Sequence, residues 1–216
     1  MKLLISISFI LLFSIVQAQP RIISFDSEQE EAKPKEETNV IKLHPLEFLS
    51  NDYSLYYEKA LLNILSAEIG LGFTYGDYWG EFSSDKDYYL SKSDNKLGFS
   101  FAGSLRFYPF ELFEDFYIAA EYKFRKYNWE REVEEYISIN SIVTKQVDES
   151  RIHSMPRLTL GYVFYLTDQF SLDLHLGIGV NTIKEKFYNN TKSVVEEVYP
   201  GAKPRMNGGI KIGYLF

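Results

Sequence analysis

The chain ends in the stretch Arg205-Met206-Asn207-Gly208-Gly209-Ile210-Lys211-Ile212-Gly213-Tyr214-Leu215-Phe216, and this stretch decides the fold. Every second residue counted back from Phe216 is apolar or glycine, and the set ends in aromatics. The residues between them are small or charged. A period of two is that of a β-strand with two different faces. Such a strand at a chain end suits a barrel that closes on itself in lipid, where no backbone edge can stay open.

The beginning of the chain predicts export. Met1-Lys2 supplies a positive charge, an apolar run follows, and Gln17-Ala18-Gln19 offers a small-residue cleavage site. This order is typical of a secretory signal peptide. We therefore expect a signal peptide over 1–18, a disordered acidic periplasmic tail over 19–38, and a transmembrane β-barrel over 39–216.

The composition narrows the class of protein further. A formal net charge of -7 argues against a nucleic-acid partner, and the absence of cysteine excludes disulfides and lipid attachment at cysteine. The 17 tyrosines and 17 phenylalanines are many for 216 residues. That density suits a membrane barrel, in which half of each strand faces lipid and aromatic girdles mark both interfaces.

Period-two runs continue along the chain and predict an all-β, eight-stranded antiparallel up-and-down transmembrane β-barrel. Pro45 falls inside the first run, where it predicts a bulge that turns Leu46 and Phe48 outward. The connections alternate between short and long, and two of the long ones read as hairpins around Asn140-Ser141 and Asn189-Asn190. The predicted strands cover 39–49, 53–59, 65–75, 97–107, 116–125, 157–166, 170–181 and 205–216.

Several of these segments resemble a known class of protein. The first strand running into Ser54-Leu55-Tyr56-Tyr57-Glu58, the run Leu105-Arg106-Phe107-Tyr108-Pro109 and the terminal Phe216 resemble small OmpA/OmpX-type outer-membrane barrels, and more closely an uncharacterised Gram-negative barrel family. The resemblance implies location in the outer membrane and no catalytic residues. It also implies assembly by the barrel-insertion machinery, which would read the last strand at Ile210, Ile212, Tyr214 and Phe216.

The inward faces of the predicted strands carry charge of both signs. An eight-stranded lumen is just wide enough for side chains, so these residues predict a packed ion-pair network that plugs the barrel. A small ion pathway or a proton relay is the alternative, because ionisable groups inside a membrane are often functional. The predicted network comprises Glu58, Glu68, Arg106, Glu121, Lys123, Arg125, Arg157, Asp173, His175, Arg205 and Lys211.

An enzyme would need a nucleophile and a base. His153 and Ser154 lie near the predicted outer rim, as a lipid-modifying enzyme would require, but adjacent strand residues point to opposite faces. We therefore predict that the chain is not an enzyme, and keep an outer-membrane lipid-modifying enzyme as an alternative. With three scattered histidines, we also expect no metal and no cofactor.

The long loops suggest a structural or surface-interaction role. Their aromatic residues could anchor contacts with an extracellular ligand, and lipid and lipopolysaccharide are the other expected partners of a monomer. A second alternative is a secreted lipocalin-like ligand-binding barrel with its apolar face inward. The candidate contact residues are Tyr78, Trp79, Tyr88, Tyr89 and Tyr136.

Overall fold

The computed structural model describes residues 39–76, 93–138, 141–189 and 192–216. The predicted signal peptide and tail lie outside these residues. The described elements are β1 (Asn39–Leu43), the 3-10 helix η1 (Pro45–Ser50), β2 (Asp52–Leu62), β3 (Leu65–Tyr75), β4 (Ser93–Phe107), β5 (Asp115–Ser138), β6 (Ser141–Tyr165), β7 (Phe170–Asn189) and β8 (Val194–Leu215).

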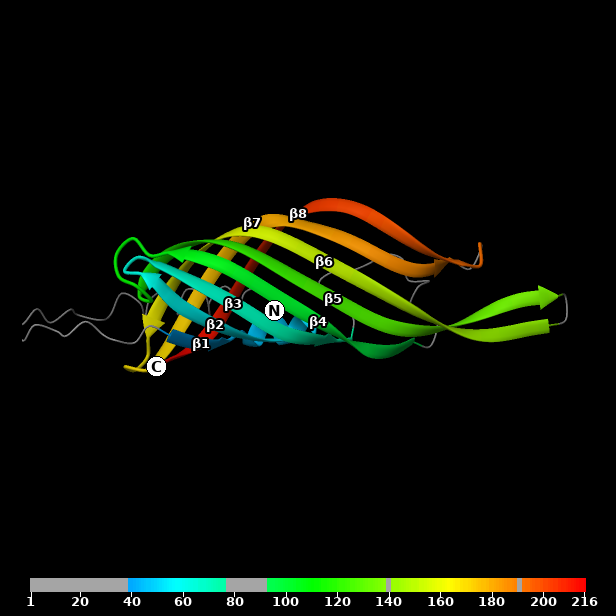
Figure 1. Cartoon of the computed structure of the whole chain (residues 1–216), viewed down its shortest axis with the longest axis horizontal. Helices are drawn as coiled ribbons and strands as arrows, with labels where there is room; N and C mark the ends of the chain where they lie inside the picture. The colour runs from blue at the N-terminus through cyan, green and yellow to red at the C-terminus, as the bar shows by residue number, and fades with distance from the viewer. Residues whose placement is uncertain (1–38, 77–92, 139–140, 190–191) are drawn as a thin grey trace, which may run out of the picture. The chain divides into compact units, whose positions relative to one another are not determined.

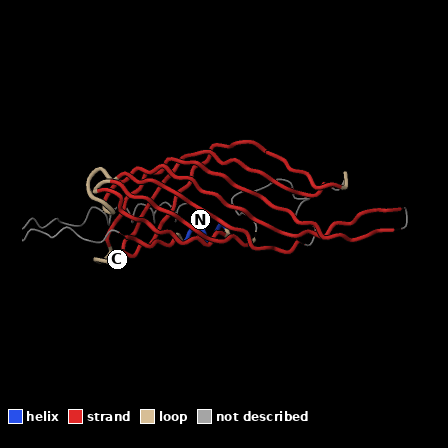
Figure 2. Tube along the Cα trace, in the orientation of Figure 1, coloured by secondary structure: helices blue, strands red, loops and turns tan. Residues whose placement is uncertain are grey.

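The eight strands form a closed barrel in sequence order, and every neighbouring pair is antiparallel (Figures 1 and 2). The ring closes where β1 pairs with β8, from Val40 opposite Leu215 to Leu43 opposite Ile212. The prediction of an all-β, eight-stranded antiparallel up-and-down barrel is confirmed. Among the described residues, no helix is long and apolar enough to cross a membrane.

The two faces of each strand differ as the period of two predicts. On β2, for example, Leu55 and Tyr57 are exposed on the outside, whereas Tyr56 and Glu58 are completely buried. The same alternation on the other strands surrounds the barrel with an outward apolar belt and fills its lumen with polar groups. A lipocalin-like barrel would need the opposite arrangement, with the apolar side chains inside.

The first strand is shorter than expected, and the prediction of one bulged strand over 39–49 is wrong beyond Leu43. The chain leaves the sheet there and forms η1. Pro45 explains the change, because it has no N–H to donate to a strand ladder but fits the first turn of a helix. The helix ends at Ser50, and the next residue, Asn51, adopts a left-handed conformation with φ 54°.

The helix also places its side chains better than a strand would. Residues three apart in a 3-10 helix lie on one line. His44 and Glu47 therefore face the lumen and are buried, whereas Leu46 and Leu49 are exposed on the outside. Had the strand continued, Glu47 would share the outward face of Leu43. The helix thus keeps a carboxylate out of the apolar belt.

The strands that lead to the predicted hairpins are long. β5 and β6 stay paired from Asp115 opposite Val163 to Ser138 opposite Ser141, and β7 and β8 pair from Phe170 to Asn189 (Figure 1). On the opposite end, the connections between β2 and β3, β4 and β5, and β6 and β7 are short. The predicted alternation of short and long connections is therefore present, although residues 77–92, 139–140 and 190–191 lie outside the described part.

The register of the closing ladder can be tested because the chain has no native cysteine. The Phe216 N–H donates to the Asn39 carbonyl at 3.1 Å, so the next pair, Val40 and Leu215, is a non-hydrogen-bonded pair. Its Cα atoms should be about 4.5 Å apart, within the range that a disulfide needs. We expect Val40→Cys/Leu215→Cys to oxidise to a bridged form, detected by thiol alkylation and mass spectrometry.

The matched control is Ile41→Cys/Leu215→Cys. Ile41 lies one residue further on β1 but faces outward, so its Cβ points away from that of Leu215. Equal bridging in the two variants would contradict the register.

Candidate functional site

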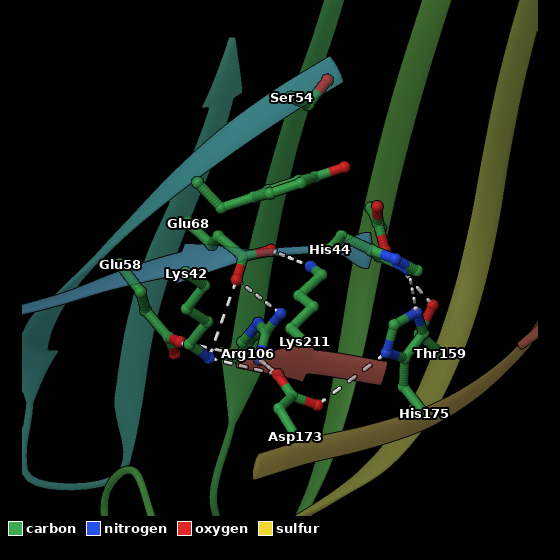
Figure 3. A network of polar contacts seen from close by, with 12 residues as sticks. Lys42, His44, Ser54, Glu58, Glu68, Arg106, Thr159, Asp173, His175 and Lys211 are labelled. Atoms are coloured by element: carbon green, nitrogen blue, oxygen red, sulfur yellow. Dashed lines mark hydrogen bonds and ion pairs between the residues drawn. The ribbon is translucent and has the colours of Figure 1, made fainter. Parts of the chain in front are cut away.

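The lower lumen holds three cations and three carboxylates in one cluster, the lower cluster: Lys42, Arg106 and Lys211 with Glu58, Glu68 and Asp173 (Figure 3). Arg106 lies at its centre. Its Nη2 donates a hydrogen bond to Glu68 and its Nη1 donates one to Asp173, each at 2.6 Å. Lys211 donates to Glu68 at 2.5 Å, and Lys42 pairs with Glu58 and reaches Asp173 at 3.1 Å. All six side chains are buried, and their formal charges cancel.

Nearly every strand contributes to the lower cluster. Its charged residues come from β1, β2, β3, β4, β7 and β8, and β5 adds Tyr117, whose hydroxyl donates to Asp173 at 2.7 Å. β6 contributes Gly161, which leaves room for the Tyr117 ring. A Cβ at this position would lie 2.3 Å from that ring. The cluster therefore joins the whole ring of strands.

A second neutral group, the upper cluster, lies beside η1. It pairs Glu47 and Asp52 with Lys123 and Arg125. Arg125 donates to Asp52 at 2.6 Å and to Glu47 at 2.8 Å, and Lys123 lies 2.9 Å from Asp52. The Tyr56 hydroxyl donates to Glu47 at 2.6 Å, which ties the inward face of η1 to β2.

Tyr56 also links the two clusters. Its hydroxyl accepts a hydrogen bond from Lys123 of the upper cluster at 2.8 Å. The Lys211 ammonium of the lower cluster lies 4.1 Å from the centre of the same ring, a cation–π distance. One buried aromatic side chain thus lies between the two clusters and contacts a lysine of each.

A pair of histidines forms a further link. The His44 and His175 Nε2 atoms are 3.3 Å apart, and His175 Nδ1 lies 3.9 Å from Asp173 of the lower cluster (Figure 3). One ring must donate and the other accept, so the accepting imidazole must be neutral and carry its proton on Nδ1. Nearby, Arg157 pairs with Glu121.

The structure places the predicted lumen residues as follows. The lower cluster contains Lys42 and five of the predicted residues: Glu58, Glu68, Arg106, Asp173 and Lys211. Two others, Lys123 and Arg125, belong to the upper cluster, and Glu121 pairs with Arg157. His175 lies beside Asp173, and Arg205 is half-buried on β8 opposite Gly179.

Three residues of the clusters were missing from the predicted set: Lys42, Glu47 and Asp52. Lys42 lies between the outward residues Ile41 and Leu43, so the period of two along the strand indicated that it faces inward. Glu47 was missed because a strand was expected where η1 forms. In a 3-10 helix, a residue three positions after the inward-facing His44 lies on the same inward face. Asp52 was assigned to a turn, but it begins β2 and is buried.

His153 and Ser154 face opposite sides of β6, as strand geometry requires. His153 is buried and its Nδ1 lies 3.3 Å from the Asn181 amide oxygen, whereas the Ser154 hydroxyl pairs with that of Tyr122 outside. Among the residues that the structure describes, no three acidic or histidine side chains are placed together to hold a metal ion. Tyr78, Trp79, Tyr88 and Tyr89 lie outside the described residues, as does the side chain of Tyr136.

Among solved structures, the chain is similar to the outer membrane protease OmpT from Escherichia coli. The two share 9% sequence identity with a TM-score of 0.37, and the likeness covers 83% of this chain and 93% of that chain. No family model and no curated protein matches the chain. At this identity and TM-score, the likeness assigns neither an activity nor site residues to the chain.

The comparison nevertheless corrects one prediction. The prediction that the chain is not an enzyme is withdrawn, because the solved barrel to which the chain is similar is a protease. The resemblance to OmpA/OmpX-type barrels stays a prediction.

The lower cluster predicts a large effect of removing one carboxylate. Glu68→Gln leaves Arg106 and Lys211 short of a negative charge in a buried site, and breaking a buried ion pair in this way costs about 3–5 kcal/mol. We expect the free energy of unfolding to fall by that amount in a urea titration of the refolded barrel. Glu197→Gln is the control, because Glu197 pairs with Lys184 at the exposed surface and its loss should leave stability unchanged. Equal effects would contradict the cluster's role.

Proposed function

We propose that the chain is an outer-membrane β-barrel whose lumen is closed and whose long hairpins form a surface for interaction outside the cell. The observation that carries this proposal is the division between the two faces of the sheet. Charged residues are buried and paired inside, while large apolar residues are exposed outside on every strand. Such an exterior is stable in lipid and aggregates in water.

The outward belt has the limits that a bilayer would impose. On β5, the outward residues pass from Ile118 and Tyr122 in the belt to Lys126, Asn128 and Glu130 above it. Aromatic pairs occur at the other end, where the Phe170 and Tyr214 rings are 5.3 Å apart. Aromatic rings at the edge of an apolar belt support placement across a membrane, with the hairpins beyond it.

The contacts inside the barrel support a closed lumen. Ions could pass only if the lower and upper clusters separated, because their side chains join opposite walls. Arg106 on β4 contacts Asp173 on β7, and Lys211 on β8 contacts Glu68 on β3. A barrel of eight strands has little space beyond such side chains.

The hairpins above the belt are held in place by a further buried carboxylate, outside the lower and upper clusters. Glu149 on β6 accepts hydrogen bonds from the Trp129 indole at 2.8 Å, from Arg131 at 2.8 and 3.0 Å, and from the Tyr188 backbone N–H at 2.9 Å. These partners come from β5 and β7, so three strands are tied together. A rigid support of this kind favours an interaction role for the segments it carries.

An exposed ion-pair group connects β4 to the same hairpin. The Lys96 ammonium lies 2.7 Å from Asp148 and 2.8 Å from Glu130. Its hydrogen bonds to these carboxylates, chiefly to Asp148, raise the pKa of Lys96 to about 12. Lys96 is charged at physiological pH and connects β4 to β5 and β6 at the exposed surface.

A charge placed in the belt tests the membrane location. Leu158 is exposed on the outside of β6, and Leu158→Arg should lower the free energy of unfolding in lipid vesicles by about 2–4 kcal/mol. Gln146→Arg, further along the same strand and above the belt, is the matched control and should have no such effect. A barrel that works in water would tolerate both substitutions and would be recovered in the soluble fraction without detergent.

Conductance across a planar bilayer tests the closed lumen. Because the two clusters join opposite walls, the folded protein should give no stable current steps after insertion. Heat-modifiable migration on a gel must first show that the sample is folded. Reproducible steps from a folded sample would contradict the closed lumen and favour an ion pathway.

A further inference from the structure

Pro156 lies in the interior of β6, a strand that has β5 on one side and β7 on the other. A proline has no N–H to give to a strand ladder, so prolines within sheets are found mainly at edges and bulges. The β6–β7 ladder keeps one register on both sides of Pro156, but no strand pair forms at Met155 and Pro156. The barrel wall therefore lacks one backbone hydrogen bond at this point.

The group that loses its donor is the carbonyl of Val180, which lies opposite Pro156 in the register of this ladder. At the end of the ladder, the Leu166 N–H donates to the Phe170 carbonyl. Backbone groups alternate along a strand, so the even-numbered residues of β7, Val180 among them, turn their N–H and C=O groups toward β6. The Val180 N–H can donate to the Pro156 carbonyl, but Pro156 returns no hydrogen bond to Val180.

The neighbouring Arg157 side chain has an unused donor. Its Nη2 donates to Glu121, and its Nη1 lies 2.9 Å from the Asn207 side-chain oxygen when that amide is oriented to accept. Its Nε is buried and has no hydrogen-bond partner among the described residues, and only 7% of the side chain is exposed. A buried donor and a buried acceptor thus lie in the same part of the wall.

A small cavity lies between these groups. Its volume is about 10 Å³, and its lining includes Pro156, Arg157 and Val180, together with Arg205 and Asn207 of β8. A cavity of this size holds one water molecule and nothing larger.

The hydrogen-bonding groups also limit what can occupy the cavity. The occupant must accept a hydrogen bond from the Arg157 Nε–H and donate one to the Val180 carbonyl. A metal cation cannot accept a hydrogen bond, a halide ion cannot donate one, and a hydrocarbon can do neither. Water does both.

We propose that one ordered water molecule binds in this cavity and bridges the Arg157 Nε–H to the Val180 carbonyl. The water supplies the hydrogen bond that Pro156 cannot give, and a carbonyl left without a donor in the wall of a membrane barrel would be costly. It also holds the guanidinium that pairs with Glu121. This site is independent of the proposed surface role of the hairpins.

The test is a crystal structure of the refolded barrel at a resolution that shows ordered water. Wild type should show one water within about 2.7–3.2 Å of both Arg157 Nε and the Val180 oxygen. Pro156→Val restores the missing N–H, which should donate to Val180 directly, so the water bridge should be lost.

The matched control is Pro204→Val. Pro204 lies opposite Val180 on the other side, in β8. The Leu215 N–H donates to Gln169, so the odd-numbered residues in this part of β8 face β7 and the Pro204 nitrogen faces away from it. The bridge should therefore persist in Pro204→Val.

Hydrogen–deuterium exchange of the folded barrel in detergent gives a second readout. In Pro156→Val, the amide introduced at position 156 should exchange as slowly as the ladder amides beside it. Heat-modifiable migration must first show that each variant is folded, and Pro156→Ala takes the place of the valine variant if valine prevents folding. The site is overturned by a wild-type structure without a water in contact with both atoms, by loss of the bridge in Pro204→Val, or by free exchange of the amide at position 156.

Discussion

The structure depends on one electrostatic constraint: a charge buried in the lumen must have an opposite charge beside it. An unpaired ion away from water costs several kcal/mol, and a pair without good geometry gains little. Arg106 meets the constraint with two carboxylates from different walls, Glu68 and Asp173. Because these partners lie on β3 and β7, the pairing can form only when the whole ring is assembled in one register. We therefore expect the lower cluster to specify the closed barrel more than it stabilises it.

The same constraint accounts for the break in β1. Successive residues of a strand face inward and outward in turn, so a shift of one residue exchanges the two faces. Lys42 and Glu47 are five residues apart, so no continuous strand can turn both of them inward. The 3-10 helix changes the period from two to three and brings Glu47 to Lys123 and Arg125. The consequence is that, among the described residues, the β1 strand ladder on β8 ends at Leu43 opposite Ile212.

The strands and their faces could be predicted because a period of two over ten residues is a strong signal, as on β3 and β7. The inward positions of Glu58, Arg106 and Lys211 followed from it directly. Which carboxylate meets which cation did not follow, because the pairing across the lumen depends on the tilt and stagger of all eight strands. Glu47 was missed for a local reason, since a proline within a strand pattern is compatible with either a bulge or a helix. The aromatic residues Tyr78 and Trp79 lie outside the described residues.

The proposed closed lumen would leave the outside of the barrel for interaction. The two clusters pair charges of opposite sign in the lower and middle lumen. Above the belt the inner face is different, because Glu149 uses its hydrogen bonds to align β5, β6 and β7 rather than to connect opposite walls. Buried charge thus has two uses in one sheet, closure below and alignment above. The segments that the proposal leaves for recognition are those that the aligned strands carry.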